Sequence, residues 1–366
     1  MVATRHRRRK SNGKQSESAQ DSPGVVDIMV LLEELISSPV PEKRTLAKLV
    51  SLTDTLREHG WEPGARAGWS EAEIAHNYTA LIRSGTRTAN LPFAAVTTEL
   101  LAANQPDTVR GTMYLVVSSG LLTNTGRSSY GKVQRLLKRL REQGVVPWEW
   151  IVDNVRQTVK PSSWSGLDDF ADTVRDAYRR NYWAGLPDYP QIIVEKDSVA
   201  GRISQVTAEY DVALHPLRGY SSITFAHAIA EDWKRINKDI YVYYIGDFDP
   251  SGMDLERSIR ETITRYADGV TFHWKRLAIL PKHFDEFDIL PLKPKKKDKR
   301  YKKFVAAHGK KCAEVEAIPA NMLRQLVREA IESQIPQESW SRLKNIEATE
   351  RNTWHELMDT LRGDAA

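Results

Sequence analysis

Residues 243–255 read YYIGDFDPSGMDL, and this stretch decides the fold. Its first residues end the apolar run DIYVYYIGD (239–247), which is typical of a buried strand. Pro250 and Gly252 then form a turn, and a helical pattern continues to about residue 267. Asp247 and Asp249 therefore lie where a strand gives way to a helix. In extended chain their two side chains project to the same side.

The same alternation of strand and helix extends over residues 188–280. Besides the run at 239–247, we expect strands over residues 188–196, 211–217 and 270–279, with helices around 198–209, 222–236 and 252–267. This spacing is typical of βαβ units. It predicts an α/β fold with a mostly parallel, Rossmann-like sheet covered by helices.

A third carboxylate, Glu195, ends the first of these strands. Ligands of a doubly wound sheet gather beyond the carboxyl ends of its strands, and neighbouring strands are roughly 5 Å apart. Glu195, Asp247 and Asp249 can therefore converge. Three carboxylates so close need a compensating cation, for which Mg²⁺, or Mn²⁺, is the natural choice. The alternative is an ordinary solvated turn.

Residues 106–153 form a distinct unit of two helices. Asp107 or Thr108 can cap the first, which runs to about Ser118; Ser128 or Ser129 can cap the second, which ends before Gly144. Apolar residues of the second helix share one face, and basic residues occupy the rest. The apolar set is Val133, Leu136, Leu137 and Leu140, and the basic set is Lys132, Arg135, Lys138, Arg139 and Arg141.

The segment after these helices alternates like a strand, with Trp148, Trp150 and Val152 on one side. Two helices followed by a strand ribbon is the order of a winged helix-turn-helix, whose basic helix enters a major groove of DNA. The alternative is an amphipathic helix whose charges only meet water.

The first helix of this unit carries a candidate nucleophile. Arg110 and Tyr114 are four residues apart, so they are neighbours on the helix surface. Tyr114 lies roughly 115° from the centre of the apolar stripe, so it is not an obvious core tyrosine. A phenol needs help to attack phosphorus, and a guanidinium one turn away can supply it. The alternative is a tyrosine packed at a domain edge.

The net charge of +5 is unevenly distributed. Residues 1–25 carry +4, residues 293–311 carry +9, and the remainder carries −8. Concentrated positive charge is expected where a protein contacts a polyanion. We expect a disordered basic arm over 1–25 and DNA contacts from Lys295, Lys296 and Lys297, although a solvated tail and a solvated loop are the alternatives.

The rest of the sequence narrows the function classes. Residues 26–100 are expected to form a helical extension and residues 336–366 a helical tail. Cys312 is the one cysteine of the 366 residues, which excludes an internal disulfide framework and favours a cytoplasmic location. We expect neither a secretory signal nor a membrane span. No Walker A or GxGxxG motif supports a nucleotide site.

Together these motifs resemble the A subunit of type IIB DNA topoisomerase (topoisomerase VI) and its relatives that make meiotic double-strand breaks. The resemblance covers roughly residues 100–330. Its recognisable parts are VRGTMY (109–114), IIVEKD (192–197), LRGYSS (217–222), YYIGDFDPSGMDL (243–255) and AEVEAIP (313–319).

The resemblance implies a winged-helix domain over 101–165 and a Toprim metal-binding domain over 185–335. It implies that Tyr114 is the transesterification nucleophile and Arg110 its phosphate partner, while Glu195, Asp247 and Asp249 bind Mg²⁺. Two chains would cut double-stranded DNA as a homodimer, each forming a 5′-phosphotyrosine link, in the cytoplasm on the nucleoid. A separate ATPase (B-type) subunit would drive strand passage.

Two other functions stay open from the sequence. On the same Toprim scaffold, a metal-dependent nuclease would use water as the nucleophile and leave Tyr114 a structural role. A non-catalytic DNA-binding module would use only the basic segments for phosphate contacts.

Overall fold

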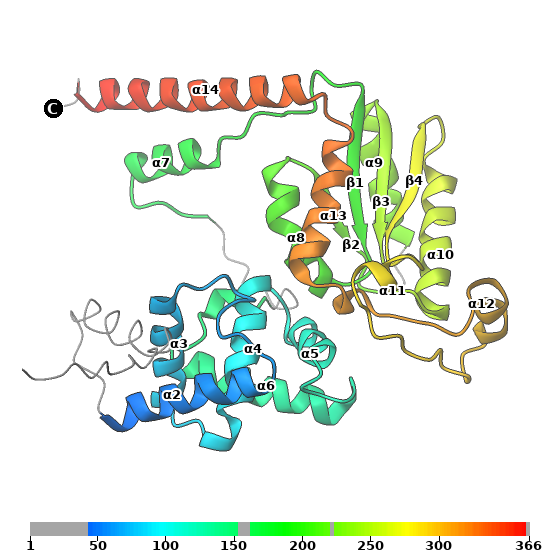
Figure 1. Ribbon diagram of the computed structural model, residues 1–366. Helices are drawn as coiled ribbons and strands as arrows, with labels where there is room; N and C mark the ends of the chain where they lie inside the picture. Colours follow the sequence, from blue (N-terminus) through cyan, green and yellow to red (C-terminus); the bar gives the residue numbers. More distant parts are fainter. Residues whose placement is uncertain (1–42, 153–161, 220–222, 364–366) are drawn as a thin grey trace, which may run out of the picture.

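The computed structural model describes residues 43–152, 162–219 and 223–363 (Figure 1). The expected arm at 1–25 lies outside the described residues, as does the beginning of the 26–100 extension. Figure 1 places a helical group made from the first part of the chain below a parallel sheet made from the second part. The chain has an α/β fold, as the alternation of strands and helices predicts.

Within residues 43–142, the helical group contains five helices and one short 3₁₀ turn. They are α2 (Lys43–Glu58), α3 (Glu71–Arg83), η1 (Thr88–Asn90), α4 (Leu91–Asn104), α5 (Val109–Ser118) and α6 (Arg127–Glu142). The centre is α4, which is apolar almost all round and contacts α2, α3 and α5. A capping box begins α3, because Ser70 and Glu73 each accept a backbone N–H of the other.

The two helices expected in 106–153 are present. Thr108 caps α5, since its hydroxyl accepts the N–H of Gly111 at 2.9 Å. The predicted apolar face of α6 is buried as expected. The predicted serine cap of α6 is wrong: the helix begins at Arg127 after Gly126, whose N–H donates to the Asn124 side chain at 2.9 Å.

The strand expected over residues 148–152 is also wrong. Residues Trp148–Trp150 form a 3₁₀ turn, η2, and pairing is limited to one isolated bridge between Asp107 and Ile151. Pro147 begins this turn. The side chain of Trp148 is 60% exposed under the guanidinium of Arg141, so the alternation of aromatic residues does not reflect a sheet face.

The sheet has four parallel strands in the order β2-β1-β3-β4. They are β1 (Asp188–Val194), β2 (Ala213–Pro216), β3 (Asp239–Ile245) and β4 (Phe272–Ala278). The four predicted strands are confirmed, each within a few residues. The strands around the site end before Glu195 and Asp247, which leaves both carboxylates just beyond the sheet.

Helices cover both faces of this sheet (Figure 1). On one face lie α8 (Asp197–Glu209) and α13 (Ala320–Glu332), and on the other lie α9 (Ile223–Ile236) and α10 (Pro250–Tyr266). Successive residues of β1 serve alternate faces: Ile192 and Val194 pack in one core cluster, and Ile193 packs in the other. Burial on both sides explains why the strands read as continuous apolar runs.

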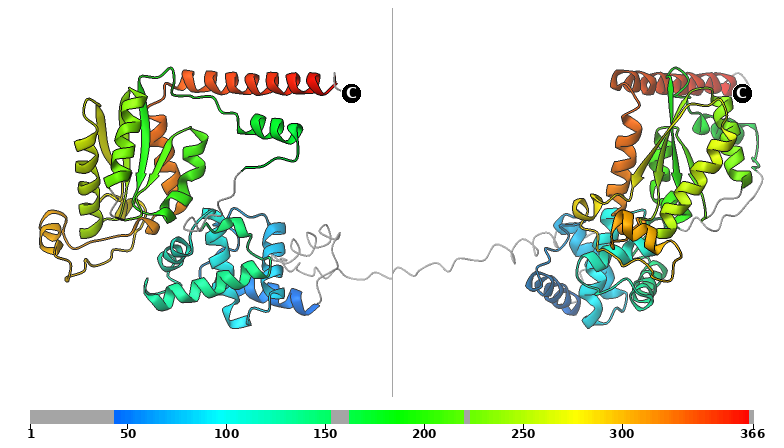
Figure 2. Two further views of the ribbon diagram at one scale, coloured as in Figure 1. Left: turned by 180° about the vertical axis from the view of Figure 1, so that it is seen from behind. Right: turned by 90° about the vertical axis from the view of Figure 1, so that its right-hand side faces the viewer.

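The remaining elements connect or extend these layers. They are α7 (Leu167–Ala177), α11 (His283–Glu286), α12 (Tyr301–His308), η3 (Val315–Ala317) and α14 (Gln337–Gly363). Figure 2 shows α14 extending away from the sheet with α7 beside it. None of the helices among the described residues is long and apolar enough to cross a bilayer.

A buried ion pair joins the helical group to the sheet. Nε of Arg202 in α8 lies 2.8 Å from Oδ1 of Asp107, just before α5, and both side chains are fully buried. Arg324 of α13 adds hydrogen bonds to the backbone carbonyls of Asn104, Gln105 and Pro106 at 2.9 to 3.1 Å. These contacts join the segment just before α5, which carries Tyr114, to the helices α8 and α13 that cover the sheet.

Candidate functional site

Two of the predicted carboxylates meet at the carboxyl end of the sheet, because β1 and β3 are neighbours. Glu195 follows β1, and its Oε2 accepts the backbone N–H of Asp247 at 2.8 Å. Asp247 follows β3, and its Oδ1 accepts the N–H of Val315 at 2.9 Å. Both side chains are nearly buried. The backbone thus holds each carboxylate in a defined orientation.

The third predicted carboxylate, Asp249, caps α10. Its Oδ1 accepts the N–H groups of Ser251 and Gly252 at 2.9 and 2.7 Å. Such a cap is favourable because the first amides of a helix lack partners within it. Gly252 is required here, since a Cβ atom would lie 2.4 Å from the carbonyl oxygen of Asp247.

Arg276 of β4 clamps the turn that carries the two aspartates. Its guanidinium donates to the carbonyl oxygens of Gly246, Asp247 and Ile279 at 2.7, 2.6 and 2.9 Å. Its charge is matched by an ion pair with Glu256 of α10. No sequence pattern points to Arg276, because its partners follow another strand about thirty residues earlier.

Lys196 supplies a positive charge at the same carboxyl end of the sheet. Its ammonium lies 2.8 Å from Oδ2 of Asp247 and 3.1 Å from Oε2 of Glu316, while Ser198 donates to Oε1 of Glu316 at 3.0 Å. We call Glu195, Asp247, Asp249 and Glu316 the acidic edge. Sequence reasoning missed both Lys196 and Glu316, although AEVEAIP was among the motifs of the resemblance.

Burial perturbs the ionisation of this cluster. It raises the pKa of Asp247 to about 7, against the opposing effect of Lys196, and it also raises the pKa of Glu195. Burial alone would lower the pKa of Lys196, but the charges of Glu316 and Asp247 outweigh it and hold that pKa above its ordinary value. Lys196 therefore stays charged at neutral pH.

The donor set suits a hard divalent cation, because every candidate ligand is a carboxylate oxygen. Within residues 43–152, 162–219 and 223–363, no three His, Cys, Asp or Glu side chains are placed together as ligands of one ion. Both oxygens of Asp247 are already engaged, by Val315 and Lys196. In the described part of the chain, Oε1 of Glu195 and Oδ2 of Asp249 are uncommitted and could ligate Mg²⁺ or Mn²⁺.

Tyr114 lies next to this edge, on α5. The helical pattern does not mark it as a core residue, but the structure buries it in the core, with its side chain only 3% exposed. The turn η3, from a distant part of the chain, packs on α5, and its Val315 and Ala317 belong to the same buried apolar cluster as Tyr114. Burial, and then the charges of Glu314 and Glu316, raise the pKa of Tyr114; Arg110 and Lys196 oppose them.

Arg110 is half-exposed on the same helix and is paired with a carboxylate. Its guanidinium lies 3.1 Å from Oε2 of Glu314 and 5.5 Å from the ring centroid of Tyr130. Glu314 immediately precedes η3, the turn that packs on α5. Arg110 thus connects α5 to the segment that follows the Lys-rich stretch.

A groove of about 590 Å³ leads from α6 to the acidic edge. Its basic lining consists of Arg110, Arg135, Lys138 and Arg141, and its far end is formed by Ser198 and Glu316.

The predicted DNA contacts of α6 therefore divide into three kinds. Arg135 and Lys138 line the groove. Lys132 is exposed, and its ammonium lies 4.0 Å from the ring centroid of Phe93. Arg139 is half-buried and donates to Thr86 at 2.9 Å.

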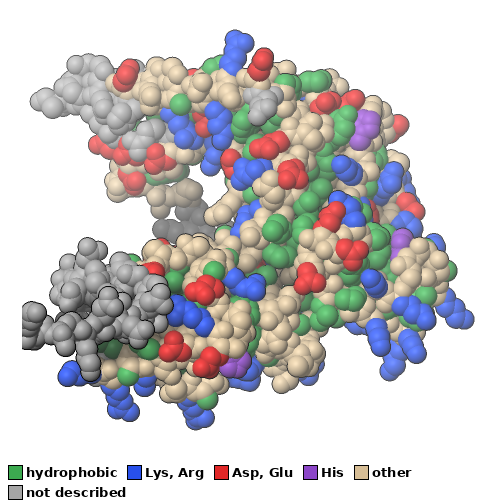
Figure 3. All heavy atoms as spheres, in the orientation of Figure 1, with side chains coloured by type: hydrophobic (Ala, Val, Ile, Leu, Met, Phe, Trp, Pro, Cys, Tyr) green, Lys and Arg blue, Asp and Glu red, His purple; other side chains and the backbone are tan. Residues whose placement is uncertain are grey.

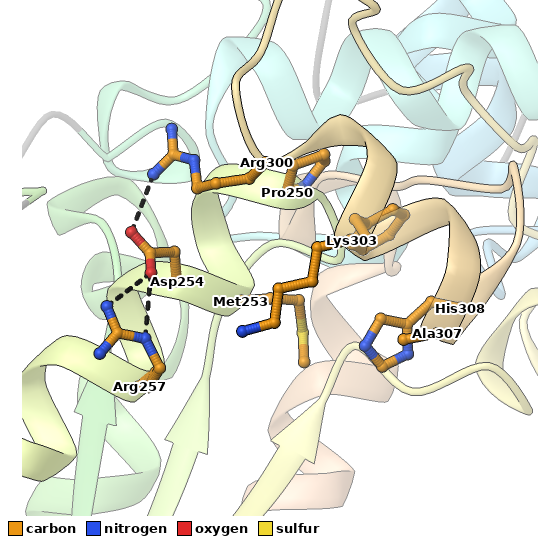
Figure 4. A pocket seen from close by; sticks show the side chains of 9 residues that line it. Pro250, Met253, Asp254, Arg257, Arg300, Lys303, Ala307 and His308 are labelled. Carbon is orange, nitrogen blue, oxygen red and sulfur yellow. Dashed lines mark hydrogen bonds and ion pairs between the residues drawn. The ribbon is translucent and has the colours of Figure 1, made fainter.

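The predicted lysines at 295–297 are all exposed. Figure 3 shows Lys and Arg side chains gathered on the surface over α12 and the stretch before it. This stretch is anchored to α10: Arg300 lies 3.1 Å from Asp254, which also pairs with Arg257 of the same helix, and all three side chains line a small pocket (Figure 4). The lysines thus come shortly before a residue, Arg300, that is paired with the helix that Asp249 caps.

No family model matches the chain, and no curated protein matches its sequence. The geometry of the acidic edge, the groove and α5 is therefore the basis for a functional assignment.

Proposed function

We propose that the chain binds double-stranded DNA and cleaves it by tyrosyl transesterification with the help of Mg²⁺, as the A subunit of type IIB topoisomerases does. The observation that carries the proposal is the meeting of two groups within one chain. Tyr114 and Arg110 of α5 lie near Glu316 and Lys196, and Lys196 in turn contacts Asp247. Tyr114 and Arg110 belong to the helical group, whereas Lys196, Glu316 and Asp247 belong to the part of the chain that forms the sheet.

The finer fold is part of the same proposal. The pair α5 and α6 would be the helix-turn-helix of a winged-helix domain, and the four-stranded parallel sheet would be a Toprim domain. The basic face of α6 on the groove, and the carboxylates beyond β1 and β3, support these assignments.

In the proposed reaction, a DNA strand enters the groove and its phosphates contact Arg110, Arg135 and Lys138. The Tyr114 oxygen loses its proton and bonds to phosphorus. The bond from phosphorus to the 3′ oxygen breaks, and that oxygen takes up a proton. The reverse steps reseal the strand without fuel, because the tyrosyl phosphodiester conserves the bond.

The residues around Tyr114 have different roles in this step. Arg110 and Lys196 both favour the phenolate, although burial outweighs them in the resting structure. A change that exposes the buried phenol is therefore needed before it can react. A cation held by Glu195, Asp247 and Asp249 would neutralise charge on the attacked phosphate. Two copies, with a separate ATPase subunit, would complete a topoisomerase-like assembly.

The burial of Tyr114 favours a second candidate function. A phenol that is covered and has a raised pKa is a poor nucleophile, whereas the acidic edge can activate water without it. The alternative is therefore a metal-dependent nuclease that hydrolyses DNA.

One experiment distinguishes the two. Supercoiled plasmid is incubated with the protein and Mg²⁺, the reaction is stopped with detergent, and DNA covalently attached to protein is measured. We expect an adduct that Tyr114→Phe abolishes while DNA binding persists. Tyr130→Phe is the matched control, since this phenol also lies near Arg110. Cleavage to free ends that persists in Tyr114→Phe and is lost in Asp249→Asn would establish hydrolysis instead.

A further inference from the structure

Lys196 directly follows Glu195 in the chain, but its ammonium is turned to other partners. It lies between Asp247 and Glu316, at 2.8 and 3.1 Å. These carboxylates come from separate elements: Asp247 follows β3, and Glu316 belongs to η3. Both are nearly buried, and the lysine itself is only 30% exposed. The contact is therefore an internal one, unlike a mobile pair on the surface.

The lysine changes what Asp247 can do. Its Oδ1 is held by the N–H of Val315, and Oδ2 is held by Lys196. Glu195 and Asp249, in contrast, each use one oxygen in hydrogen bonds to backbone amides. A cation that needs Asp247 as a ligand must therefore take Oδ2 from the ammonium.

Electrostatics gives the reason for a positive charge at this position. Asp247 and Glu316 are buried, and two such carboxylates repel each other unless a positive charge lies between them. A protein ammonium can fill this role whenever no metal ion does. An ammonium and a divalent cation at the same oxygen are, however, alternatives.

We propose that Lys196 is a built-in counter-cation of the acidic edge, which positions Asp247 and Glu316 in the metal-free protein and competes with a divalent cation for Asp247. The inference rests on the proposed function for the cation site itself. It adds that cation binding is an exchange, in which the ammonium of Lys196 leaves Oδ2 of Asp247. Lys196 is a positioning residue in this scheme.

The test measures Mn²⁺ binding to the full chain without DNA, by isothermal titration and by the electron paramagnetic resonance signal of free Mn²⁺. Lys196→Met keeps the length of the side chain and removes its charge. We expect it to bind Mn²⁺ at least about tenfold more tightly than the natural protein, since a charge-assisted contact is lost from the competing state. Thermal unfolding verifies that the variant is folded.

Two controls separate competition from a general change in charge. Lys196→Arg retains the positive charge, and we expect an affinity close to that of the natural protein. Lys303→Met removes an equal charge from the exposed side of α12, and we expect less than about a twofold change, because exposed charges are screened. If Lys303→Met tightens binding as much as Lys196→Met, the effect is general and the proposal is overturned.

A third variant tests whether the exchange takes place at Asp247. In an Asp247→Asn background there is no carboxylate to contest, so Lys196→Met should produce no further tightening. Tightening that persists there overturns the proposal. If Lys196→Met simply fails to fold, Lys196→Gln and the comparison with Lys196→Arg give the same readout.

Failure of the inference and failure of the proposed function give different results. If the natural protein binds Mn²⁺, loses it in Asp249→Asn, and is unchanged by Lys196→Met, the cation site stands and the exchange is wrong. If neither the natural protein nor Lys196→Met binds Mn²⁺, both the proposed cation site and the exchange are wrong.

Discussion

The acidic edge and the basic surface of this protein are built in opposite ways. The carboxylates of Glu195, Asp247 and Asp249 are each fixed by backbone amides. The basic surface, which we define as the exposed side chains of Lys132, Arg135, Lys138 and the lysines at 295–297, is largely in contact with solvent. Charges fixed in a buried site hold a bound group in a defined position, whereas exposed charges provide long-range attraction to a polyanion. Substitutions in the two regions should therefore differ in size and in salt dependence.

The largest effect on stability is expected at the buried ion pair that joins the helical group to the sheet. Arg202→Met leaves Asp107 buried without its partner, and we expect it to lower the free energy of unfolding by about 3–5 kcal/mol. Urea denaturation measures this loss. The control is Arg218→Met, since Arg218 pairs with Asp197 while mostly exposed and should cost less than about 1 kcal/mol. Equal losses for the two variants would contradict the structure.

The next effect tests how tightly the aspartate turn is packed. Gly252→Ala places a methyl group against the backbone of Asp247, and we expect a loss of about 1–3 kcal/mol in stability together with weaker Mn²⁺ binding. Gly131→Ala in α6 meets only the flexible end of Arg135, so it should be neutral or stabilising. A neutral Gly252→Ala would mean that the turn is looser than described.

A pH dependence follows from the raised pKa of Asp247. The unfolded chain releases this proton near its ordinary pKa of 3.8, while the folded chain keeps it until about pH 7. The folded state therefore binds more protons in this window, so the contribution of this carboxyl to stability falls as the pH rises from about 4 to about 7. Unfolding measured across this range should show the natural protein losing stability relative to Asp247→Asn. If the difference in unfolding free energy between the natural protein and Asp247→Asn does not change with pH, Asp247 keeps its ordinary pKa.

The smallest effect per residue is expected at the Lys-rich stretch. Replacing the three lysines at 295–297 with Gln should weaken DNA binding without changing the unfolding free energy. It should also reduce the slope of log affinity against log salt, by up to about 0.9 per lost phosphate contact. The control replaces three exposed lysines that pair with nearby acids, Lys234, Lys282 and Lys344. Equal losses of DNA affinity for the two sets of substitutions would mean that the Lys-rich stretch contributes only charge, whatever its position on the surface.

Local patterns in the sequence were enough to predict the sheet and the position of its carboxylates. Apolar runs buried on both faces identify the strands, and Glu195 and Asp247 follow directly from where those runs end. The cap at Thr108 and the buried face of α6 are likewise encoded within a few residues. In these cases the residues that decide the structure are neighbours in the chain.

The failures arise where distant segments meet. The helical pattern of α5 places Tyr114 outside its own apolar stripe, but η3, about two hundred residues later, supplies a second apolar surface. The tryptophans after α6 alternate as in a strand, yet Trp148 stacks on Arg141 without a strand partner. The roles of Lys196 and Arg276 also depend on partners in other elements, so no periodicity in the sequence could reveal them.

The pairing of Arg110 with Glu314 has a mechanical consequence. Glu314 neutralises the guanidinium of Arg110, and the next residue begins η3, the turn that packs on the helix of Tyr114. If a phosphate of DNA binds Arg110 as proposed, it must displace this carboxylate, which is one residue from η3. Phosphate binding would then act on the packing of η3 against α5 through a single peptide link.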